Sequence, residues 1–134
     1  MHNVLFACVH NAGRSQMAAA FFNELADPGR ARAASAGTQP THAVHPVVVE
    51  AMREAGVDLA GSRPQQLTPE LATDATLLVT MGCGDRCPFV PGLEVTDWPL
   101  SDPKDRPLAE VRTIRDDIRS RVLALVKSRG WERP

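Results

Sequence analysis

The chain has 134 residues, of which 43% are hydrophobic, and its 15 basic and 16 acidic side chains give a formal net charge of -1. This length predicts a single domain, residues 1–134, with a core of its own. The near balance of charge argues against a nucleic-acid or anionic-membrane partner, so any anion has to be held locally.

The N-terminal segment MHNVLFACVHNAGRS has neither the basic region nor the cleavage pattern of a signal peptide. Charge or proline interrupts every apolar stretch before the roughly 20 residues that span a bilayer. Three cysteines, an odd number, fit a reducing compartment better than a framework of structural disulfides. We therefore expect a cytoplasmic protein whose cysteines carry chemistry.

Strand-like and helix-like segments alternate along the chain. Residues 75–81, ATLLVTM, form a nearly continuous apolar run, which is typical of a parallel strand covered on both faces. The order βαβαβ(β)α predicts an α/β fold, a three-layer doubly wound sandwich with a four-stranded parallel sheet and helices on both faces. The expected strands are residues 4–7, 31–36, 75–81 and 93–96, and the expected helices are 15–25, 48–55, 68–72 and 108–125.

The loop after the first predicted strand holds the spacing Cys8, five residues, Arg14 and Ser15. In an open parallel sheet this is the usual place for a ligand. A short loop there can direct its backbone N–H groups at a tetrahedral oxyanion, and the start of the next helix adds its positive end. We expect Val9, His10, Asn11, Ala12, Gly13, Arg14 and Ser15 to form this oxyanion site.

Three side chains of this loop have individual expected roles. Arg14 can bridge two anion oxygens, and Ser15 can donate a hydrogen bond to the Cys8 sulfur, which favours a nucleophilic thiolate. Asn11 and Gly13 suit unusual backbone conformations, and the Asn11 side chain can pin the loop from inside. The alternative is that Cys8 simply ends a buried strand.

The segment CVHNAGRSQMA, residues 8–18, resembles the active-site loop of low-molecular-weight protein tyrosine phosphatases and of the arsenate reductases derived from them. The resemblance extends over essentially the whole chain and implies the phosphatase fold. It also implies that Asp102, in WPLSDP, is the general acid that protonates the leaving oxygen. Taken alone, Asp102 and Pro103 would be ordinary turn residues.

A second cysteine pair, Cys83 and Cys87 in VTMGCGDRCP, follows the third predicted strand at the same sheet edge as Cys8. The resemblance implies a reductase relay. Cys8 attacks arsenate, Cys83 attacks the Cys8 sulfur and releases arsenite, and Cys87 resolves the disulfide. Zinc is a weaker interpretation of the pair, because only His42 and His45 could complete the ligand set.

The resemblance also sets the expected partners. Arsenate is the expected substrate, with phosphate or sulfate as competing anions, and the donor is thioredoxin or a mycothiol and mycoredoxin-type system. The close spacing of Cys83 and Cys87 leaves that choice open. We expect no cofactor and no metal; a glutamate that binds potassium in some relatives is replaced by Ala19.

Two other functions remain alternatives. The first is a phosphatase acting on phosphate monoesters, which the absence of any tyrosine disfavours, because phosphatases of the family place tyrosines at the mouth of the pocket. The second is a non-enzymatic thiol switch or oxyanion-binding regulator. A DNA-reading helix or basic patch would support the second, and the sequence shows neither.

Overall fold

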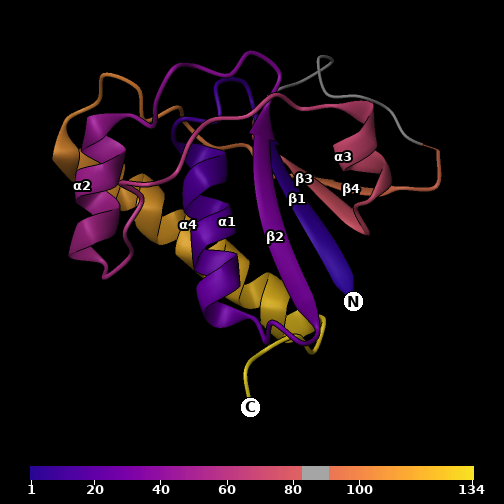
Figure 1. The fold of residues 1–134 in the computed structure, drawn as a ribbon. Helices are drawn as coiled ribbons and strands as arrows, with labels where there is room; N and C mark the ends of the chain where they lie inside the picture. The colour runs from indigo at the N-terminus through magenta and orange to yellow at the C-terminus, as the bar shows by residue number, and fades with distance from the viewer. Residues whose placement is uncertain (83–90) are drawn as a thin grey trace.

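The computed structural model describes residues 1–82 and 91–134, and its strands form one parallel sheet in the order β2-β1-β3-β4 (Figure 1). The strands are β1 (His2–Cys8), β2 (Ala31–Gly37), β3 (Leu77–Thr80) and β4 (Glu94–Asp97). β1 pairs with β2 along its whole length and with β3 on its other side. The predicted four-stranded parallel sheet is therefore confirmed.

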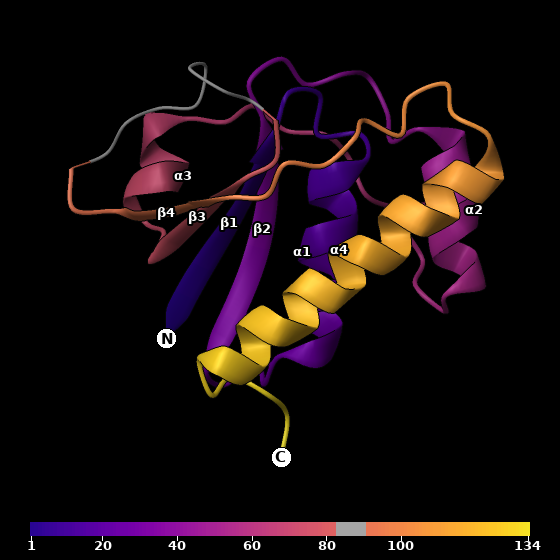
Figure 2. The same cartoon turned by 180° about the vertical axis from the view of Figure 1, so that it is seen from behind.

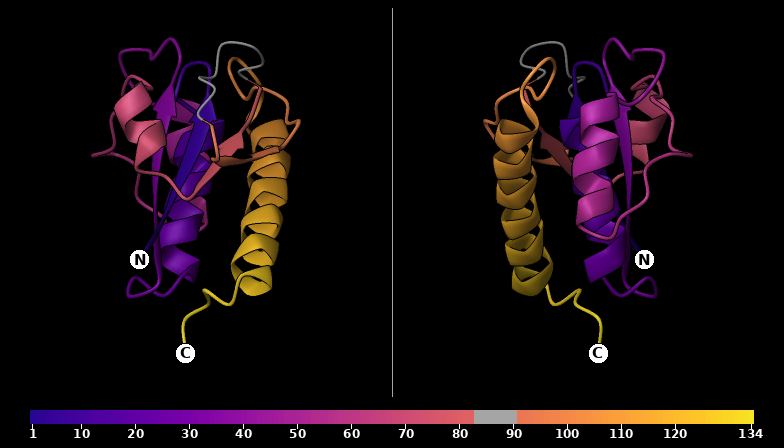
Figure 3. Two further views of the ribbon diagram at one scale, coloured as in Figure 1. Left: turned by 90° about the vertical axis from the view of Figure 1, so that its right-hand side faces the viewer. Right: turned by 90° about the vertical axis from the view of Figure 1, so that its left-hand side faces the viewer.

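In the described part of the chain, four helices pack on the two faces of this sheet: α1 (Arg14–Leu25), α2 (Pro46–Glu54), α3 (Pro69–Thr73) and α4 (Leu108–Ser128). Figure 3 shows α4 and the short α3 on opposite sides of the sheet, while α1 and α2 lie on the α4 side. The expected three-layer arrangement is thus present, with most of its helical mass on one face. Within residues 1–82 and 91–134, no helix is long and apolar enough to cross a membrane.

Alternation along β1 divides the core between the two faces. Val4, Phe6 and Cys8 pack with α1, α2 and α4, whereas Leu5 and Ala7 pack with residues of α3 and its approach. A period of two is the consequence of the pleat, which turns successive side chains to opposite faces. β3 is buried on both faces, as its apolar sequence predicts, and β4 is exposed along its length.

Some element boundaries differ from the sequence-based expectation. β3 begins at Leu77 rather than residue 75, and α4 continues three residues beyond 125. The alanine-rich segment predicted as residues 31–36 is a strand one residue longer, because every residue of it pairs with β1. Gly56 follows the end of α2 with φ +82, the left-handed conformation in which glycine commonly ends a helix.

Both tryptophans are buried in the core. Trp98 is 8% exposed and its ring centroid lies 5.7 Å from that of Phe6. Trp131 is 6% exposed and meets Phe22 edge-on at 5.9 Å.

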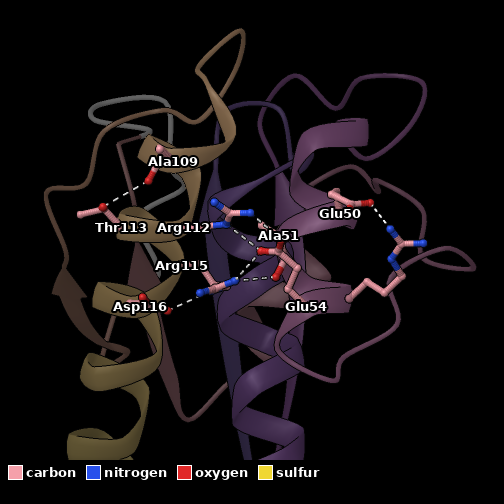
Figure 4. Close-up of polar contacts among 9 residues, drawn as sticks. Glu50, Ala51, Glu54, Ala109, Arg112, Thr113, Arg115 and Asp116 are labelled. Carbon is pink, nitrogen blue, oxygen red and sulfur yellow. Dashed lines mark hydrogen bonds and ion pairs between the residues drawn. The ribbon is translucent and has the colours of Figure 1, made fainter.

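Ion pairs join α2 to α4 (Figure 4). Arg112 donates through Nε and Nη2 to the two carboxylate oxygens of Glu54, at 2.8 and 2.7 Å. Arg115 donates to the same carboxylate at 3.3 Å and to the carbonyl oxygen of Ala51 at 2.8 Å. The hydrogen bonds from Arg112 hold the pKa of Glu54 below its usual value.

The carboxyl ends of the strands meet at one edge of the sheet. At that edge the β1–α1 loop lies among the loops that precede α2 and α4, whereas the chain termini lie at the opposite end (Figures 1 and 2). This edge is where the predicted site residues that the structure describes come together.

Candidate active site

Every carbonyl group of the loop from Cys8 to Gly13 accepts a hydrogen bond from a neighbouring segment or from α1. The donors, in order, are Thr38 N at 3.2 Å, Gln39 N at 2.8 Å, Thr41 N at 3.1 Å, Gln16 Nε2 at 3.1 Å, His45 N at 2.9 Å and Met17 N at 3.0 Å. Most of them belong to the segment between β2 and α2. The outer side of the loop is therefore fully bonded to the rest of the fold.

The N–H groups of the same loop face the other way. In a trans peptide the C=O of one residue and the N–H of the next point in opposite directions, so outward carbonyls at 8–13 direct the N–H groups of 9–14 to the concave side. Across the described part of the chain, none of the N–H groups of residues 9–13 donates to another residue. α1 starts at Arg14 and adds its unpaired first amides and its positive end. Such a nest of amides suits an anion.

The Cys8 sulfur lies at one end of a short chain of hydrogen bonds inside this loop. Its Sγ is 2.9 Å from Ser15 Oγ, the contact that the sequence predicts, and Asn11 Nδ2 donates to the same Oγ at 2.7 Å. Cys8 is 2% exposed, and Asn11 and Ser15 are fully buried. An anion has to reach the sulfur from the concave side of the loop.

One unusual backbone angle and one close approach shape the backbone of this loop. Asn11 has φ +50, a conformation that asparagine tolerates better than most residues, in agreement with the expectation from sequence. Gly37, the register partner of Cys8, lies so close that a Cβ on it would be 2.6 Å from Val9 O and 2.9 Å from Asn11 N. No role was predicted for Gly37, although its place at the end of the strand beside Cys8 was a usable signal.

Arg14 brings a buried guanidinium to the same edge of the sheet. It is 7% exposed, donates through Nη1 to the carbonyl oxygen of Leu100 at 3.1 Å, and places Nη2 3.8 Å from Asp102 Oδ2. A Cβ on Gly82 would lie 2.5 Å from Arg14 Nη1. Arg14 and Asp102, 88 positions apart in sequence, thus meet beside the loop.

The loop that carries Asp102 packs directly on the Cys8 loop. A Cβ on Gly13 would be 2.6 Å from Pro103 Cγ, so the close packing of the two loops requires glycine here. The backbone angle does not require it, because the Gly13 φ of -147 is not left-handed. The Asp102 side chain is 42% exposed, so its carboxyl group is open to solvent and to a bound molecule. The structure therefore holds a carboxyl group and a sulfur at one site, as acid and nucleophile chemistry requires.

Two histidines border this site. Burial is the largest effect on His45 and lowers its pKa, with Asp102 acting in the opposite direction. The Nδ1 atom of His10 lies 3.1 Å from the carbonyl oxygen of Gln39, so this ring contacts the neighbouring loop.

The two remaining predicted site residues, Cys83 and Cys87, lie outside the described residues. Within residues 1–82 and 91–134, no group of three or more histidine, cysteine, aspartate or glutamate side chains could hold a metal ion. Sequence reasoning also missed the contacts that Gln16, Gly82 and the Leu100 carbonyl make with the loop or Arg14.

Comparison with known proteins agrees with this geometry. The model of the low molecular weight phosphotyrosine protein phosphatase family matches residues 3–132. A putative arsenate reductase of Halobacterium salinarum is 38% identical over 126 residues, which are 90% of this chain and 87% of the relative. A glutaredoxin arsenate reductase of Synechocystis sp. is 33% identical over 129 residues, 94% of this chain and 97% of the relative.

One solved structure resembles this chain in both fold and sequence. The thioredoxin-dependent arsenate reductase of Corynebacterium glutamicum superposes with a TM-score of 0.82 at 38% identity, covering 96% of this chain and 61% of that one. The family match spans nearly the whole chain and includes both the Cys8 loop and Asp102. The chain belongs to the low molecular weight phosphotyrosine protein phosphatase family, in which the relatives compared above are named arsenate reductases.

Proposed function

We propose that this chain reduces arsenate to arsenite, with Cys8 as the nucleophile. The observation that carries the proposal is the convergence, at one sheet edge, of a nest of unpaired amides, the Cys8 sulfur and the Arg14–Asp102 pair. The relatives named arsenate reductases support this substrate over a phosphate ester. The Cys83 and Cys87 pair in the sequence provides thiols for the electron transfer.

In the first step, the amides of residues 9–15 and the Arg14 guanidinium hold arsenate against Cys8. The Cys8 thiolate attacks arsenic and forms an S–As bond. Asp102 gives its proton to the departing oxygen, which leaves as water rather than hydroxide. Because Ser15 Oγ lies 2.9 Å from the Cys8 sulfur, its hydroxyl can stabilise the thiolate before attack.

In the second step, the Cys83 thiolate attacks the Cys8 sulfur. A Cys8–Cys83 disulfide forms, the S–As bond breaks, and its electron pair stays on arsenic, which leaves as arsenite. In the third step, Cys87 attacks the Cys83 sulfur, so that Cys8 returns as a thiolate and a Cys83–Cys87 disulfide remains. Two electrons have then moved from the cysteine thiols to arsenic.

The Cys83–Cys87 disulfide has to be reduced by an external thiol. Thioredoxin is the donor that the Corynebacterium glutamicum relative's name supports, and the Synechocystis relative's name points to glutaredoxin. A mycothiol and mycoredoxin-type donor is the remaining candidate. Each of these requires a reducing compartment, and we therefore place the reaction in the cytoplasm.

Turnover of arsenate with each donor tests the proposal. The unmodified protein should consume arsenate with at least one donor, and Cys8→Ser should abolish this consumption completely. Arsenate-dependent oxidation of the donor by the Cys8→Ser protein would refute the role of Cys8.

The relay is tested separately from the nucleophile. Cys83→Ser and Cys87→Ser should each stop multiple turnover, and the Cys87 variant should accumulate a disulfide between Cys8 and Cys83, identified by peptide mass spectrometry. Full turnover by the double variant with a small thiol as donor would eliminate the internal relay while leaving arsenate reduction by Cys8 intact.

Phosphate-ester hydrolysis is the competing function, because the same amides and the same acid would serve a phosphoryl group. The family description favours it, and the relatives' names favour reduction. Rapid hydrolysis of an aryl phosphate, with no arsenate turnover by any of the donors, would select the phosphatase.

A further inference from the structure

Gln16 faces three oxygen atoms behind the Cys8 loop. This residue of α1 is 6% exposed, and its Nε2 lies 3.1 Å from Asn11 O, 3.2 Å from Asn11 Oδ1 and 3.2 Å from Arg63 O. All three are acceptors, so only the nitrogen end of the amide can point at them. The orientation of the Gln16 amide is thereby determined.

The same contacts determine the orientation of Asn11. Its Oδ1 accepts from Gln16 Nε2 and, at 3.0 Å, from the backbone N–H of Gln65. Since a backbone N–H can only donate, the atom that faces it has to be oxygen. The Asn11 Nδ2 group then points to Ser15 Oγ at 2.7 Å, where it donates.

The Ser15 hydroxyl connects these hydrogen bonds to the Cys8 sulfur. Ser15 Oγ accepts from Asn11, so its single proton is available for Cys8 Sγ, 2.9 Å away. A donor at the sulfur favours the charged thiolate over the neutral thiol. The sequence of donors therefore runs from Gln16 through Asn11 and Ser15 to Cys8.

We infer that Gln16 is a positioning residue that acts on the reactivity of Cys8 without touching it, by fixing the Asn11 amide so that the Ser15 proton is directed at the sulfur. The inference rests on the proposed role of Cys8 as nucleophile. Without the Gln16 donor, only the Gln65 N–H still holds Asn11 Oδ1. The Asn11 amide is then held less tightly, and Ser15 directs its proton at the sulfur for a smaller fraction of the time.

Alkylation of Cys8 by iodoacetamide across a pH range measures this effect, because the thiolate is the reacting form. The full chain carrying Cys83→Ser and Cys87→Ser leaves Cys8 as its one thiol. In this background, Gln16→Met should move the pH midpoint of alkylation upward by about one unit. That is a tenfold loss of thiolate below the midpoint, equivalent to about 1.4 kcal/mol.

Gln66→Met is the matched control. Gln66 Nε2 also donates to three carbonyl oxygens, those of Gly37, Thr38 and Leu67, and none of these belongs to Asn11. Its replacement removes a similar set of bonds and should leave the midpoint unchanged. If Gln16→Met lowers the melting temperature but keeps the midpoint of the parent protein, Gln16 is only a structural residue and the inference is wrong.

The route through Ser15 has its own test. In a Ser15→Ala background, Gln16→Met should shift the midpoint no further, because the link between them is already broken. Full additivity of the two shifts would contradict the route.

A measurement on the unsubstituted Gln16 protein avoids any folding defect of the variants. The side-chain amide signals of Gln16 should change in the NMR spectrum as Cys8 ionises, whereas those of Gln66 should not. A Gln16 signal that stays constant through the ionisation of Cys8 would overturn the inference.

Alkylation uses no arsenate, so the two proposals can fail separately. If Cys8 of the parent protein reacts only as a neutral thiol, the proposed function loses its nucleophile. If the parent reacts as a thiolate and Gln16→Met is identical to it, only the positioning role is lost.

Discussion

Gly82→Ala tests whether the fold reserves space for the Arg14 guanidinium. Gly82 has φ +93, and a Cβ there would lie 2.5 Å from Arg14 Nη1. Non-bonded heavy atoms prefer about 3.5 Å or more, so the guanidinium has to move by about 1 Å. Because Nη1 donates to Leu100 O at 3.1 Å, that movement breaks the bond that holds Arg14 beside the loop.

Two effects of the substitution have different sizes and different readouts. The positive φ costs an alanine about 1–2 kcal/mol of folding free energy. Displacement of Arg14 removes a charge-assisted hydrogen bond to a bound anion, worth about 1.5–3 kcal/mol. We therefore expect a dissociation constant for phosphate that is roughly 10- to 100-fold higher.

Gly56→Ala separates these two effects. Gly56 has φ +82, and a Cβ there would have nothing within 4 Å. Both variants should lose stability in urea denaturation, but only Gly82→Ala should weaken phosphate binding in isothermal titration calorimetry. Equal phosphate affinity in the two variants would refute the claim that Gly82 makes room for Arg14.

Three further substitutions test other parts of the structure. Gly13→Ala would place a methyl carbon 2.6 Å from Cγ of Pro103, the residue after Asp102. The resulting displacement of the acid should lower arsenate turnover at least tenfold. Phosphate affinity measured by calorimetry should stay nearly unchanged. Glu54→Gln should lower the melting temperature at pH 7. The difference in melting temperature from the unsubstituted protein should disappear in acid. The hydrogen bonds from Arg112 lower the Glu54 pKa in the folded protein. The stabilisation from Glu54 is therefore lost as pH falls from its pKa in the unfolded chain through its lower pKa in the folded protein. Asp102→Asn should lower the pKa of His45 further in an NMR titration, since it removes a charge that raises it; an upward shift would contradict the arrangement.

Local sequence predicted the centre of the site well. The strand, small-residue loop and helix around Cys8 follow from consecutive residues, and the Ser15 contact with the sulfur follows from the loop's own geometry. Asp102 was singled out only through the family resemblance; the structure places its carboxylate 3.8 Å from the Arg14 guanidinium. Cys83 and Cys87 remain predictions.

The contacts that hold the loop from behind had no local signal. Gln65 N meets Asn11 Oδ1 across 54 positions, and Gly82 meets Arg14 across 68. A glutamine in a polar loop or a glycine after a strand has many ordinary explanations. Only the three-dimensional packing shows that these residues contact the loop or its arginine.

The way the loop is built also bears on how arsenate is selected under the proposed function. The segment from Thr38 to His45 satisfies most of the loop carbonyls, so the amides are oriented by folding before any anion arrives. Such a preformed nest responds to charge and tetrahedral shape, which phosphate shares with arsenate, and therefore discriminates little between them at the binding step. Discrimination then has to arise after binding, when attack on the Cys8 sulfur leaves an electron pair on the central atom. Arsenic accepts that pair and leaves as arsenite, whereas phosphorus does not, so phosphate should slow the reaction as a competitor without consuming a thiol.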